Sequence, residues 1–539
     1  MDIEELAVWA VALRFGGVLT LAALLSADLI LLRDAAWMHW VERRQLFLNL
    51  GDFFFHFLEI WFSLHSDMLD NIADSVKSPE TGLPDAGAWM ELLRLHMEKA
   101  AMEKADMGTF ERMIQERVKD LAGPLLQYGV QMLADQQEMI CPRCGSELKV
   151  EEHRRERTVT TIFGEVSIKR SYGYCKQCDE RFYPADHTLK LHGRAPASPR
   201  VQEISSLMVL KSPSGQAQED VRRMTGLDIG QATLHREARR QGERALQLRE
   251  TDVALTNSRE GIKTLSKRAS VPEKPFTLVI EMDAWNIRER DHWGESEKLR
   301  KKGVDPSRWH WVYTGTIFRL DQRGTSDTGR SVITERGYVA TRGGPEALEK
   351  QVYAEALQRG LSQAKSVLVL ADGAVWIWNL AKNRFKDATH RVDLWHVNEH
   401  LWAVANDIYG QGTPEARQWV QPLLSWLKRR KDGALDVISA LEDIRSDITE
   451  LTEKQVQMLD REIGYFEERK DKMDYKNGKA LDQPLGSGAI ESTCSQYQCR
   501  FKRTGQFWSL EGDEAFLALQ TLHWNRRWHW LFPHDRKKE

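Results

Sequence analysis

Three acidic residues stand where a folded chain could bring them together as metal ligands. Two strand-like apolar runs each end on an aspartate, Phe276–Asp283 and Ser366–Asp372. A glycine-rich loop, Leu485–Glu491, delivers a glutamate to the first turn of an expected helix. Carboxylates from strand ends and a helix are the usual ligands for a pair of magnesium ions around a phosphodiester. The pattern therefore predicts metal-dependent phosphoryl transfer.

Each of these acids also has a structural explanation. Strand-end capping accounts for Asp283 and Asp372, and charge at a helix N-terminus accounts for Glu491. Glu281 points to the same side of its strand as Asp283, so it is the alternative first acid. Other acids near in sequence are Asp291, Glu295 and Asp393. The three acids are predicted to form one site because a single sheet could bring their elements together.

A short Asp-x-x-His element is a further candidate. Asp393 and His396 are three residues apart, so they share one face of an expected helix. His396 is predicted to hydrogen-bond a DNA phosphate or a neighbouring carboxylate, and a structural histidine is the alternative. Basic residues predicted to neutralise DNA strand phosphates follow the third acid: Arg500, Lys502 and Arg503.

Four of the six cysteines form two Cys-x-x-Cys pairs, which is a spacing typical of zinc ligation. Cys141 pairs with Cys144, and Cys175 pairs with Cys178. Four thiolates close a tetrahedral site and leave no open position for substrate, so the predicted zinc is structural. Free or redox-active cysteines are the alternative. Basic residues around the pairs favour DNA contact. Nearby glutamates reduce the positive charge, so a zinc that only supports folding is the alternative.

Residues 217–236 have the pattern of two helices joined by a tight turn at Gly226. In a helix-turn-helix, the second helix lies in the DNA major groove while neighbouring arginines contact phosphates. The residues predicted to bind DNA are Arg222, Arg223, Thr233, His235 and Arg236. Any two helices joined by a glycine turn fit this pattern, so the pattern alone does not indicate DNA binding. The neighbouring cysteine pairs make DNA binding the favoured interpretation.

The elements that must position these residues predict a multidomain α/β protein. Helical periodicity is expected over 1–135 and 196–255, on either side of a zinc ribbon at 136–190. The ribbon should contain a hairpin about Gly164. A polar stretch at 256–274 is expected to be a linker.

The remaining regions carry the predicted acids. Strand-like runs at 276–282, 309–320, 331–340 and 366–371, with a helix at 346–361, predict a mixed sheet with helices on its faces over 272–400. Residues 401–475 are expected to be a purely helical insertion. The final helix of the core is expected within 476–530.

Bulk properties set the limits of these predictions. A chain of 539 residues with 42% hydrophobic and 29% charged residues is typical of a soluble multidomain protein. The net charge of −3 confines any nucleic-acid contact to local patches. Phe15–Leu32 is apolar except for Asp28, and that aspartate favours a buried or dimerising helix over a membrane span. The acidic start Met1–Glu5 argues against a signal peptide.

Over residues 136–530, these features resemble a bacterial insertion-sequence transposase of the DDE type, and within that class the Kra-type group. The matching stretches are the two cysteine pairs, Met224–Leu227, Glu281–Asp283, Leu370–Gly373, Asp393–His396 and Gly486–Ser492. The resemblance implies an RNase H-like core with an all-α insertion. It also implies that Asp283, Asp372 and Glu491 are the catalytic magnesium ligands. Related chains often have Asp-Gly where this one has Asp283-Ala284.

The function implied by this resemblance is Mg²⁺-dependent DNA cleavage followed by strand transfer. Two Mg²⁺ ions, or Mn²⁺, and a structural Zn²⁺ would be the cofactors. The partners would be the terminal inverted repeats of the element, target DNA and further copies of the chain, in the cytoplasm near the nucleoid and without a membrane. Two alternatives remain: a zinc-ribbon DNA-binding regulator without chemistry, and a metal-dependent nuclease that never joins strands.

Overall fold

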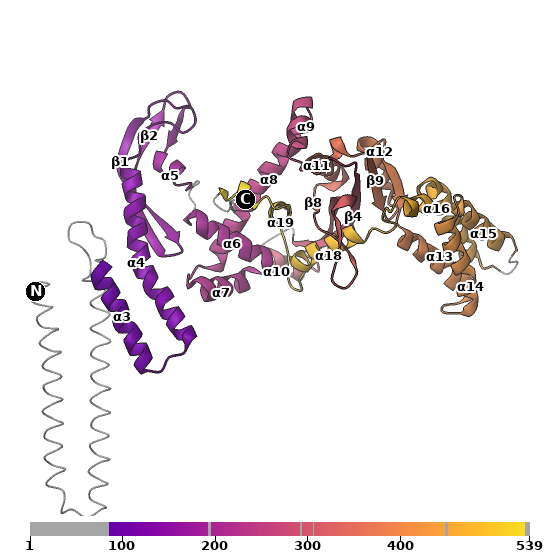
Figure 1. Ribbon diagram of the computed structural model, residues 1–539, viewed down its shortest axis with the longest axis horizontal. Helices are drawn as coiled ribbons and strands as arrows, with labels where there is room; N and C mark the ends of the chain where they lie inside the picture. The colour runs from indigo at the N-terminus through magenta and orange to yellow at the C-terminus, as the bar shows by residue number, and fades with distance from the viewer. Residues whose placement is uncertain (1–85, 192–195, 291–293, 306, 448–450, 534–539) are drawn as a thin grey trace, which may run out of the picture. The chain divides into compact units, whose positions relative to one another are not determined.

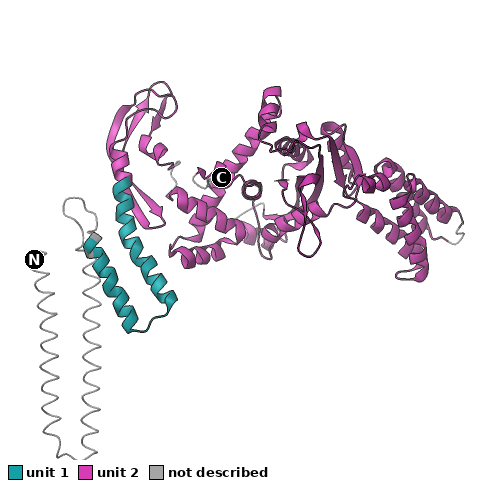
Figure 2. Ribbon diagram, viewed as in Figure 1, with its two compact units in different colours: residues 1–129 teal, residues 130–539 magenta. Residues whose placement is uncertain are grey.

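The computed structural model describes residues 86–191, 196–290, 294–305, 307–447 and 451–533. The chain divides into two compact units, residues 1–129 and 130–539 (Figure 2). Helices α3 (Ala86–Met102) and α4 (Met107–Asp135) form the described part of the first unit, and α4 continues past its boundary. Their helical structure agrees with the expectation for this region. The apolar segment Phe15–Leu32 lies outside the described residues.

A three-stranded antiparallel sheet begins the second unit. It consists of β1 (Lys149–Thr161), β2 (Gly164–Cys175) and β3 (Glu180–Phe182). The predicted hairpin is confirmed, and Gly164 makes its turn with a φ of 106°, a conformation that suits glycine. The short helix α5 (Pro184–Thr188) follows.

Four helices lead from this sheet to the core. They are α6 (Pro199–Lys211), α7 (Ser214–Thr225), α8 (Gln231–Leu255) and α9 (Arg259–Ser266). The predicted helical pair is α7 and α8, with left-handed Gly226 ending α7 at a φ of 62°. The expectation of a linker at 256–274 is wrong over α9, because Ser258 caps that helix by accepting a hydrogen bond from Gly261 N at 3.0 Å.

The central sheet has five strands in the order β10-β9-β4-β5-β8. Figure 1 labels β8, β4 and β9 of this sheet. Their bounds are β4 (Thr277–Arg290), β5 (Ser307–Arg319), β8 (Gly337–Thr341), β9 (Ser366–Ala371) and β10 (Thr389–Val392). Strands β4, β5 and β8 are antiparallel neighbours, whereas β4, β9 and β10 run parallel. The prediction of a mixed sheet is therefore confirmed.

Two strand boundaries differ from the sequence predictions. Strand β4 does not end at Asp283 but continues to Arg290, which pairs with Ser307 of β5. Beyond Asp283 the strand alternates between buried and partly exposed residues, so it lacks the continuous apolar run that marked its first half. The predicted strand at 331–340 is two strands, since β7 (Ser331–Ile333) pairs with β6 (Arg323–Thr325) and β8 joins the central sheet.

Alternate residues of β4 face two separate cores. On one face, Leu278, Ile280 and Met282 pack with α11 (Gly344–Gln358) and α12 (Val375–Arg384). On the other face, Trp285 and Ile287 pack with α8 and with two later helices, α18 (Gly488–Phe501) and α19 (Leu510–Trp524). Asp283 has the same parity as Trp285, so it lies on the α18 face.

The described residues between β10 and α18 form helices, as expected for 401–475. This region contains α13 (Leu394–Tyr409), α14 (Pro414–Arg429), α15 (Gly433–Asp447), α16 (Glu453–Arg469) and α17 (Tyr475–Ala480). Its buried residues continue the core of the α11 and α12 face. The remaining short helix, α10 (Ser296–Lys301), lies between β4 and β5. Across the described ranges, no helix is long and apolar enough to cross a membrane.

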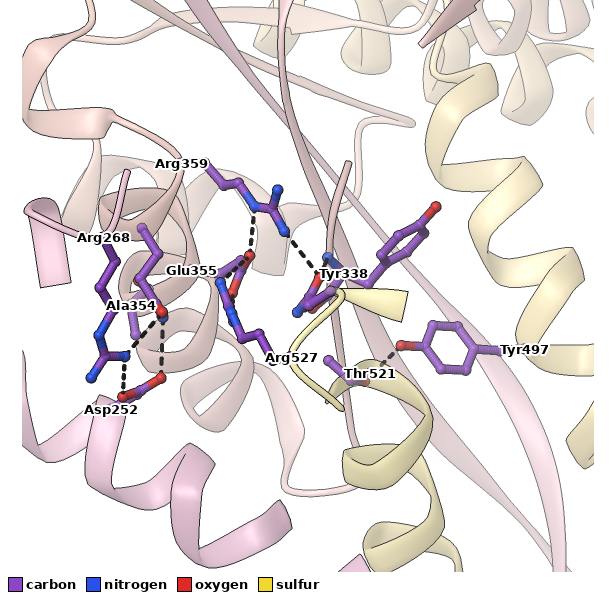
Figure 3. Close-up of polar contacts among 11 residues, drawn as sticks. Asp252, Arg268, Tyr338, Ala354, Glu355, Arg359, Tyr497, Thr521 and Arg527 are labelled. Carbon is purple, nitrogen blue, oxygen red and sulfur yellow. Dashed lines mark hydrogen bonds and ion pairs between the residues drawn. The ribbon is translucent and has the colours of Figure 1, made fainter. Parts of the chain in front are cut away.

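A buried ion-pair network holds the end of the chain against α11 (Figure 3). Glu355 is 5% exposed at its side chain and accepts hydrogen bonds from Arg527 at 2.6 and 3.0 Å and from Arg359 at 2.8 Å. The side-chain amide of Asn525 accepts a hydrogen bond from Tyr338 N in β8 and donates one to Tyr338 O. Burial opposes ionisation of Glu355, but the charges of Arg527 and Arg359 outweigh it and lower the pKa of this carboxyl.

A buried pair of acids, Glu289 and Asp513, shares Arg342 at the N-terminus of α19. Asp513 and Glu289 are 0% and 2% exposed, and both approach the guanidinium of Arg342. The Arg342 Nε lies 3.4 Å from Asp513 Oδ2. Burial raises the pKa of Asp513, and the adjacent Glu289 and Glu514 raise it further while Arg342 lowers it. Burial and the two neighbouring glutamates therefore favour the protonated form of Asp513.

Glu355→Gln is expected to lower the free energy of unfolding by about 3 kcal/mol, because it leaves two partly buried guanidinium groups without their buried counter-charge. Denaturant titration of the full chain measures this change. Glu250→Gln, at an exposed position on α8, should stay within about 0.5 kcal/mol of the wild type. An equal effect of the two substitutions would contradict the role of the network.

The raised pKa of Asp513 makes stability depend on pH. The folded state keeps a proton that the unfolded chain releases above pH about 4, so stability should fall as pH rises through the neutral range. Asparagine does not titrate, so the stability of Asp513→Asn should fall less steeply with pH. The slopes of the variant and the wild type should differ by up to about 1.4 kcal/mol per pH unit. Denaturation midpoints measured between pH 5 and 8 test this. Parallel curves for the two proteins would show that Asp513 is ionised in the fold.

Candidate metal site and nucleic-acid surfaces

Asp372 follows directly on the end of β9, as predicted. Its Oδ1 accepts a hydrogen bond from Ala374 N at 3.0 Å, which caps the turn into α12. Gly373 has a φ of 106°, which only glycine adopts readily. The carboxylate is half-buried. A side chain at the carboxyl end of a parallel strand is well placed to contact a ligand.

Asp283 lies in the middle of β4, opposite Thr314 of β5. Its Oδ1 accepts a hydrogen bond from Ala284 N at 2.6 Å, and the thiol of Cys494 is a further hydrogen-bonding partner. Burial raises the pKa of Asp283, and the charge of Asp372 raises it further. The two predicted aspartates are thus close enough to interact electrostatically, since β4 and β9 are adjacent parallel strands.

Two buried carboxylates fix the start of α18, the helix that carries Glu491. Glu281 of β4 accepts a hydrogen bond from Ile490 N at 2.8 Å. Asp393, which caps α13, also accepts hydrogen bonds from the backbone N of Ser487 at 2.6 Å and from its hydroxyl. Ile490 N also donates to Ser487 O at 3.1 Å, so Glu281 adds a second acceptor at a helix start, where N–H groups are poorly satisfied. Glu281 thus acts on the position of α18, a role different from that of an alternative first acid.

Burial raises the pKa of Glu281 to about 8. The hydrogen bond from Ile490 opposes this effect, while the charges of Asp393 and Glu491 add to it. Glu281, Asp283, Asp393 and Glu491 therefore concentrate acidic groups at one place on the sheet. A divalent cation would relieve their mutual repulsion.

Within the described ranges, one acidic group has the spacing to hold a metal ion: Asp393, His396 and Glu491. Their ligand atoms all lie within 4.8 Å of one another. Asp393 is buried, His396 is partly buried and Glu491 is exposed in the first turn of α18. His396 Nδ1 also lies 3.2 Å from Glu399 Oε2. The Asp-x-x-His element is therefore joined to the third predicted acid.

The predicted triad of Asp283, Asp372 and Glu491 is not itself such a compact group among the described residues. Asp283 interacts electrostatically with both Asp372 and His396, so it connects the aspartate pair with the Asp393 group. Oxygen donors such as these carboxylates suit Mg²⁺ or Mn²⁺, whereas an imidazole donor suits transition metals. The donor chemistry of the region thus fits a divalent cation.

Sequence reasoning missed two residues that contact the acids. Cys494, which lies outside the two Cys-x-x-Cys pairs, is buried and bonded to Asp283, and burial raises the pKa of its thiol. It lies three residues after Glu491, a spacing that could have placed both on neighbouring positions of one helix. Ser487 bonds Asp393 across 94 positions of sequence, and nothing local signals that contact.

The basic residues after Glu491 have different environments. Arg500 is 7% exposed and donates from Nε and Nη2 to Val209 O at 3.0 and 2.7 Å. These contacts hold the end of α6 from the inner face of α18 and do not support the predicted contact of Arg500 with DNA phosphates. Lys502 is exposed, with its ammonium 5.4 Å from the ring of Trp309, and exposed Arg503 donates to Lys211 O at 3.1 Å.

The predicted DNA-binding residues of α7 and α8 are partly engaged with one another. Arg222 and Arg223 both pair with Glu219. Arg236 donates to Thr233 Oγ1 at 3.1 Å. The ring of His235 lies 5.1 Å from that of Phe516, which joins the start of α8 to α19. Nucleic acid would have to compete with Glu219 for both arginines.

The four predicted zinc ligands lie together at one end of the β1–β2 hairpin. Cys141 and Cys178 have Sγ atoms 3.9 Å apart, and those of Cys144 and Cys175 are 3.5 Å apart. A tetrahedral zinc with bonds of about 2.3 Å needs sulfur separations of about 3.8 Å. All four cysteines are free of disulfides. The cluster is consistent with a structural zinc.

The charges around this cluster are largely paired. Arg143 bonds Glu180 and Arg181 bonds Glu151, each at 2.7 Å. Arg170 is buried and pairs with Asp186 at 2.6 Å. These contacts favour a structural role for the arginines, so they do not strengthen the expectation of DNA contact at the ribbon.

Cys144→Ser is expected to reduce bound zinc from about one ion per chain to a small fraction, because a closed four-thiolate site needs every ligand. Native mass spectrometry of the full chain measures the stoichiometry. Cys499→Ser, at an exposed cysteine outside the cluster, should keep the zinc. Zinc retained equally by both variants would show that the four cysteines are not its ligands.

The comparisons with known proteins give one family. A family model described as an uncharacterised protein family, UPF0236, matches residues 110–527. The search of curated proteins gives no match. The matched span runs from α4 to the turn after α19, so it includes the cysteine cluster, the central sheet and all the acids described above. It covers well over half of the sequence, and the chain therefore belongs to the UPF0236 family.

Proposed function

We propose that the chain is a DDE-type transposase, which cuts DNA at the ends of an insertion element and joins them to a target. The proposal depends above all on one observation: the elements that carry the three acids meet at one place. Strand β4 pairs with β9, and α18 is bonded to β4 through Glu281. The electrostatic coupling of Asp283 with Asp372 supports a shared site.

The strand order supports an RNase H-like core. Along the chain, the first three strands of the central sheet, β4, β5 and β8, are antiparallel neighbours, and they are followed by β9 and β10, which run parallel to β4. This is the arrangement expected of an RNase H-like sheet. The insertion of α13–α17 between β10 and α18 agrees with the resemblance seen in the sequence. A fold alone does not define chemistry, so the acids carry the functional argument.

The chain's residues would have distinct tasks in phosphoryl transfer. Asp283, Asp372 and Glu491 would hold the divalent cations, while Asp393 and Glu281 would fix α18 beside them. When bound, Mg²⁺ would stabilise the negative charge on the phosphate oxygens and lower the pKa of the attacking water. His396 would stand as a further ligand or as a hydrogen-bond donor to a phosphate oxygen.

Two transfers at one site would account for cutting and joining. In the first, water attacks phosphorus and the phosphodiester bond breaks to release a 3′-hydroxyl. In the second, that hydroxyl attacks a target phosphodiester and displaces a new 3′-oxygen. Lys502 and Arg503 are the exposed cations near the end of α18 that would neutralise strand phosphates. The helical pair α7–α8 and the ribbon would supply recognition of element ends, and copies of the chain would bridge two ends.

Asp372→Asn and Glu491→Gln are each expected to reduce Mg²⁺-dependent cleavage of an element-end DNA by roughly 100-fold or more, because each removes an anionic metal ligand. Gel assays with the purified full chain measure cleavage and joining. Asp387→Asn, at an exposed position beyond α12, is the matched control and should cut like the wild type.

The outcomes separate three functions. Cleavage without joined products would favour a nuclease that only hydrolyses. DNA binding that needs no Mg²⁺, with no cleavage by the wild type, would favour a regulator. Full activity of both acid variants would rule out the proposed ligands.

A further inference from the structure

The C-terminal turn of α16, within the helical insertion, lies against the loop that follows Asp372. Arg469 Nε donates a hydrogen bond to Gly373 O at 3.1 Å. A Cβ atom built on Gly373 would lie 3.2 Å from both Arg469 Nε and the hydroxyl oxygen of Tyr465. The insertion therefore places a phenolic hydroxyl beside the residue that follows a proposed metal ligand.

This hydroxyl is buried, and it has no hydrogen-bond partner among the described residues. Buried polar groups almost always have a partner, so an unpaired one calls for an explanation. Burial raises the pKa of Tyr465; Arg469 opposes the effect, and the charge of Asp372 adds to it. The group therefore stays protonated and is available as a donor.

The tyrosine ring is held in place from several sides. The ring of His400 stacks on it with centroids 3.8 Å apart and planes inclined by 22°. Arg469 lies over the ring at 4.4 Å, and Phe466 meets it nearly edge-on at 5.5 Å. His400 is itself bonded to Glu462 at 2.5 Å. Such packing fixes the hydroxyl before any ligand binds.

The position of the hydroxyl narrows the choice of acceptor. Because it is buried, a partner is expected from an adjacent side chain and not from a nucleic-acid strand. Asp372 precedes Gly373 directly, and its charge acts on Tyr465. One oxygen of Asp372 accepts the Ala374 N–H, and a carboxylate can accept several more hydrogen bonds. The charges of Glu462 and Asp393 also act on Tyr465, but less than that of Asp372, and these two acids already bond His400 and Ser487. Asp372 is therefore the favoured acceptor.

We propose that Tyr465 is a positioning residue for Asp372, to which its hydroxyl donates a hydrogen bond when that carboxylate ligates a divalent cation. The proposal rests on the proposed function only in taking Asp372 as a metal ligand. Partners of metal-binding side chains orient the ligand and strengthen metal binding, typically by 10- to 100-fold. The insertion would then contribute directly to the acidic site.

Tyr465→Phe is expected to weaken Mn²⁺ binding by the full-length protein by about tenfold, measured by electron paramagnetic resonance titration. Cleavage at limiting Mn²⁺ should fall by a similar factor and recover at saturating Mn²⁺. The melting temperature of the metal-free protein should stay the same or rise, since the variant removes an unpaired buried hydroxyl. A hydroxyl with a purely structural hydrogen bond would instead lower it.

Tyr409→Phe is the matched control. This tyrosine ends α13, about 24 Å along the helix axis from Asp393, and its ring packs on Trp419. It should leave Mn²⁺ binding unchanged. If the wild type binds Mn²⁺ and cuts DNA and Tyr465→Phe does both equally well, this inference fails while the proposed function stands. A wild type that neither binds Mn²⁺ nor cuts would overturn both.

Discussion

The attachment of α18 to the sheet is the interaction on which the acidic region depends. Two buried carboxylates, Glu281 and Asp393, accept hydrogen bonds from backbone N–H groups at the helix start. Burying a carboxyl group is costly unless hydrogen bonds or nearby positive charge compensate it, and burial is the main cause of the raised pKa of Glu281. The free N–H groups and the dipole of a helix N-terminus provide such compensation. The helix start and the buried acids therefore stabilise one another.

The orientation set by these bonds determines what the rest of α18 does. Glu491 lies in the first turn near Asp393 and His396, and Cys494 faces Asp283 one turn later. Arg500 then turns inward onto α6. A helix rotated about its axis would lose all of these contacts together. The acidic site and the packing of α6 are thus coupled through one rigid element.

The sequence predicted the parts of this site whose signals are local. Asp372 after an apolar strand and Glu491 after a glycine loop both depend on a few neighbouring residues. The role of Glu281 could not be predicted, because its partner Ile490 lies 209 positions away. The burial of Arg500 was missed because its charge was weighed without its spacing of seven from buried Thr493, which places both on one helix face.

The same limit explains the fold-level differences. The mixed sheet followed from the order of apolar runs, but β4 continued beyond Asp283 where its pattern changes from continuous to alternating. Helix α9 was missed because it is short and polar. The side chain of Tyr465 carries no local signal at all, since its environment is created by the return of α16 to the loop after β9.

The two ends of the helical insertion are bonded to each other, and this base of the insertion limits which changes in its sequence the fold can accept. Leu394 N donates to Leu485 O at 2.9 Å, and Asp393 bonds Ser487, so both ends of the insertion meet at one point. The entropy cost of closing a chain segment grows only slowly with its length. Helices far from this base could therefore be lengthened, shortened or replaced at little thermodynamic cost, provided that α16 still reaches Gly373. The base, rather than the bulk of the insertion, is where change is constrained.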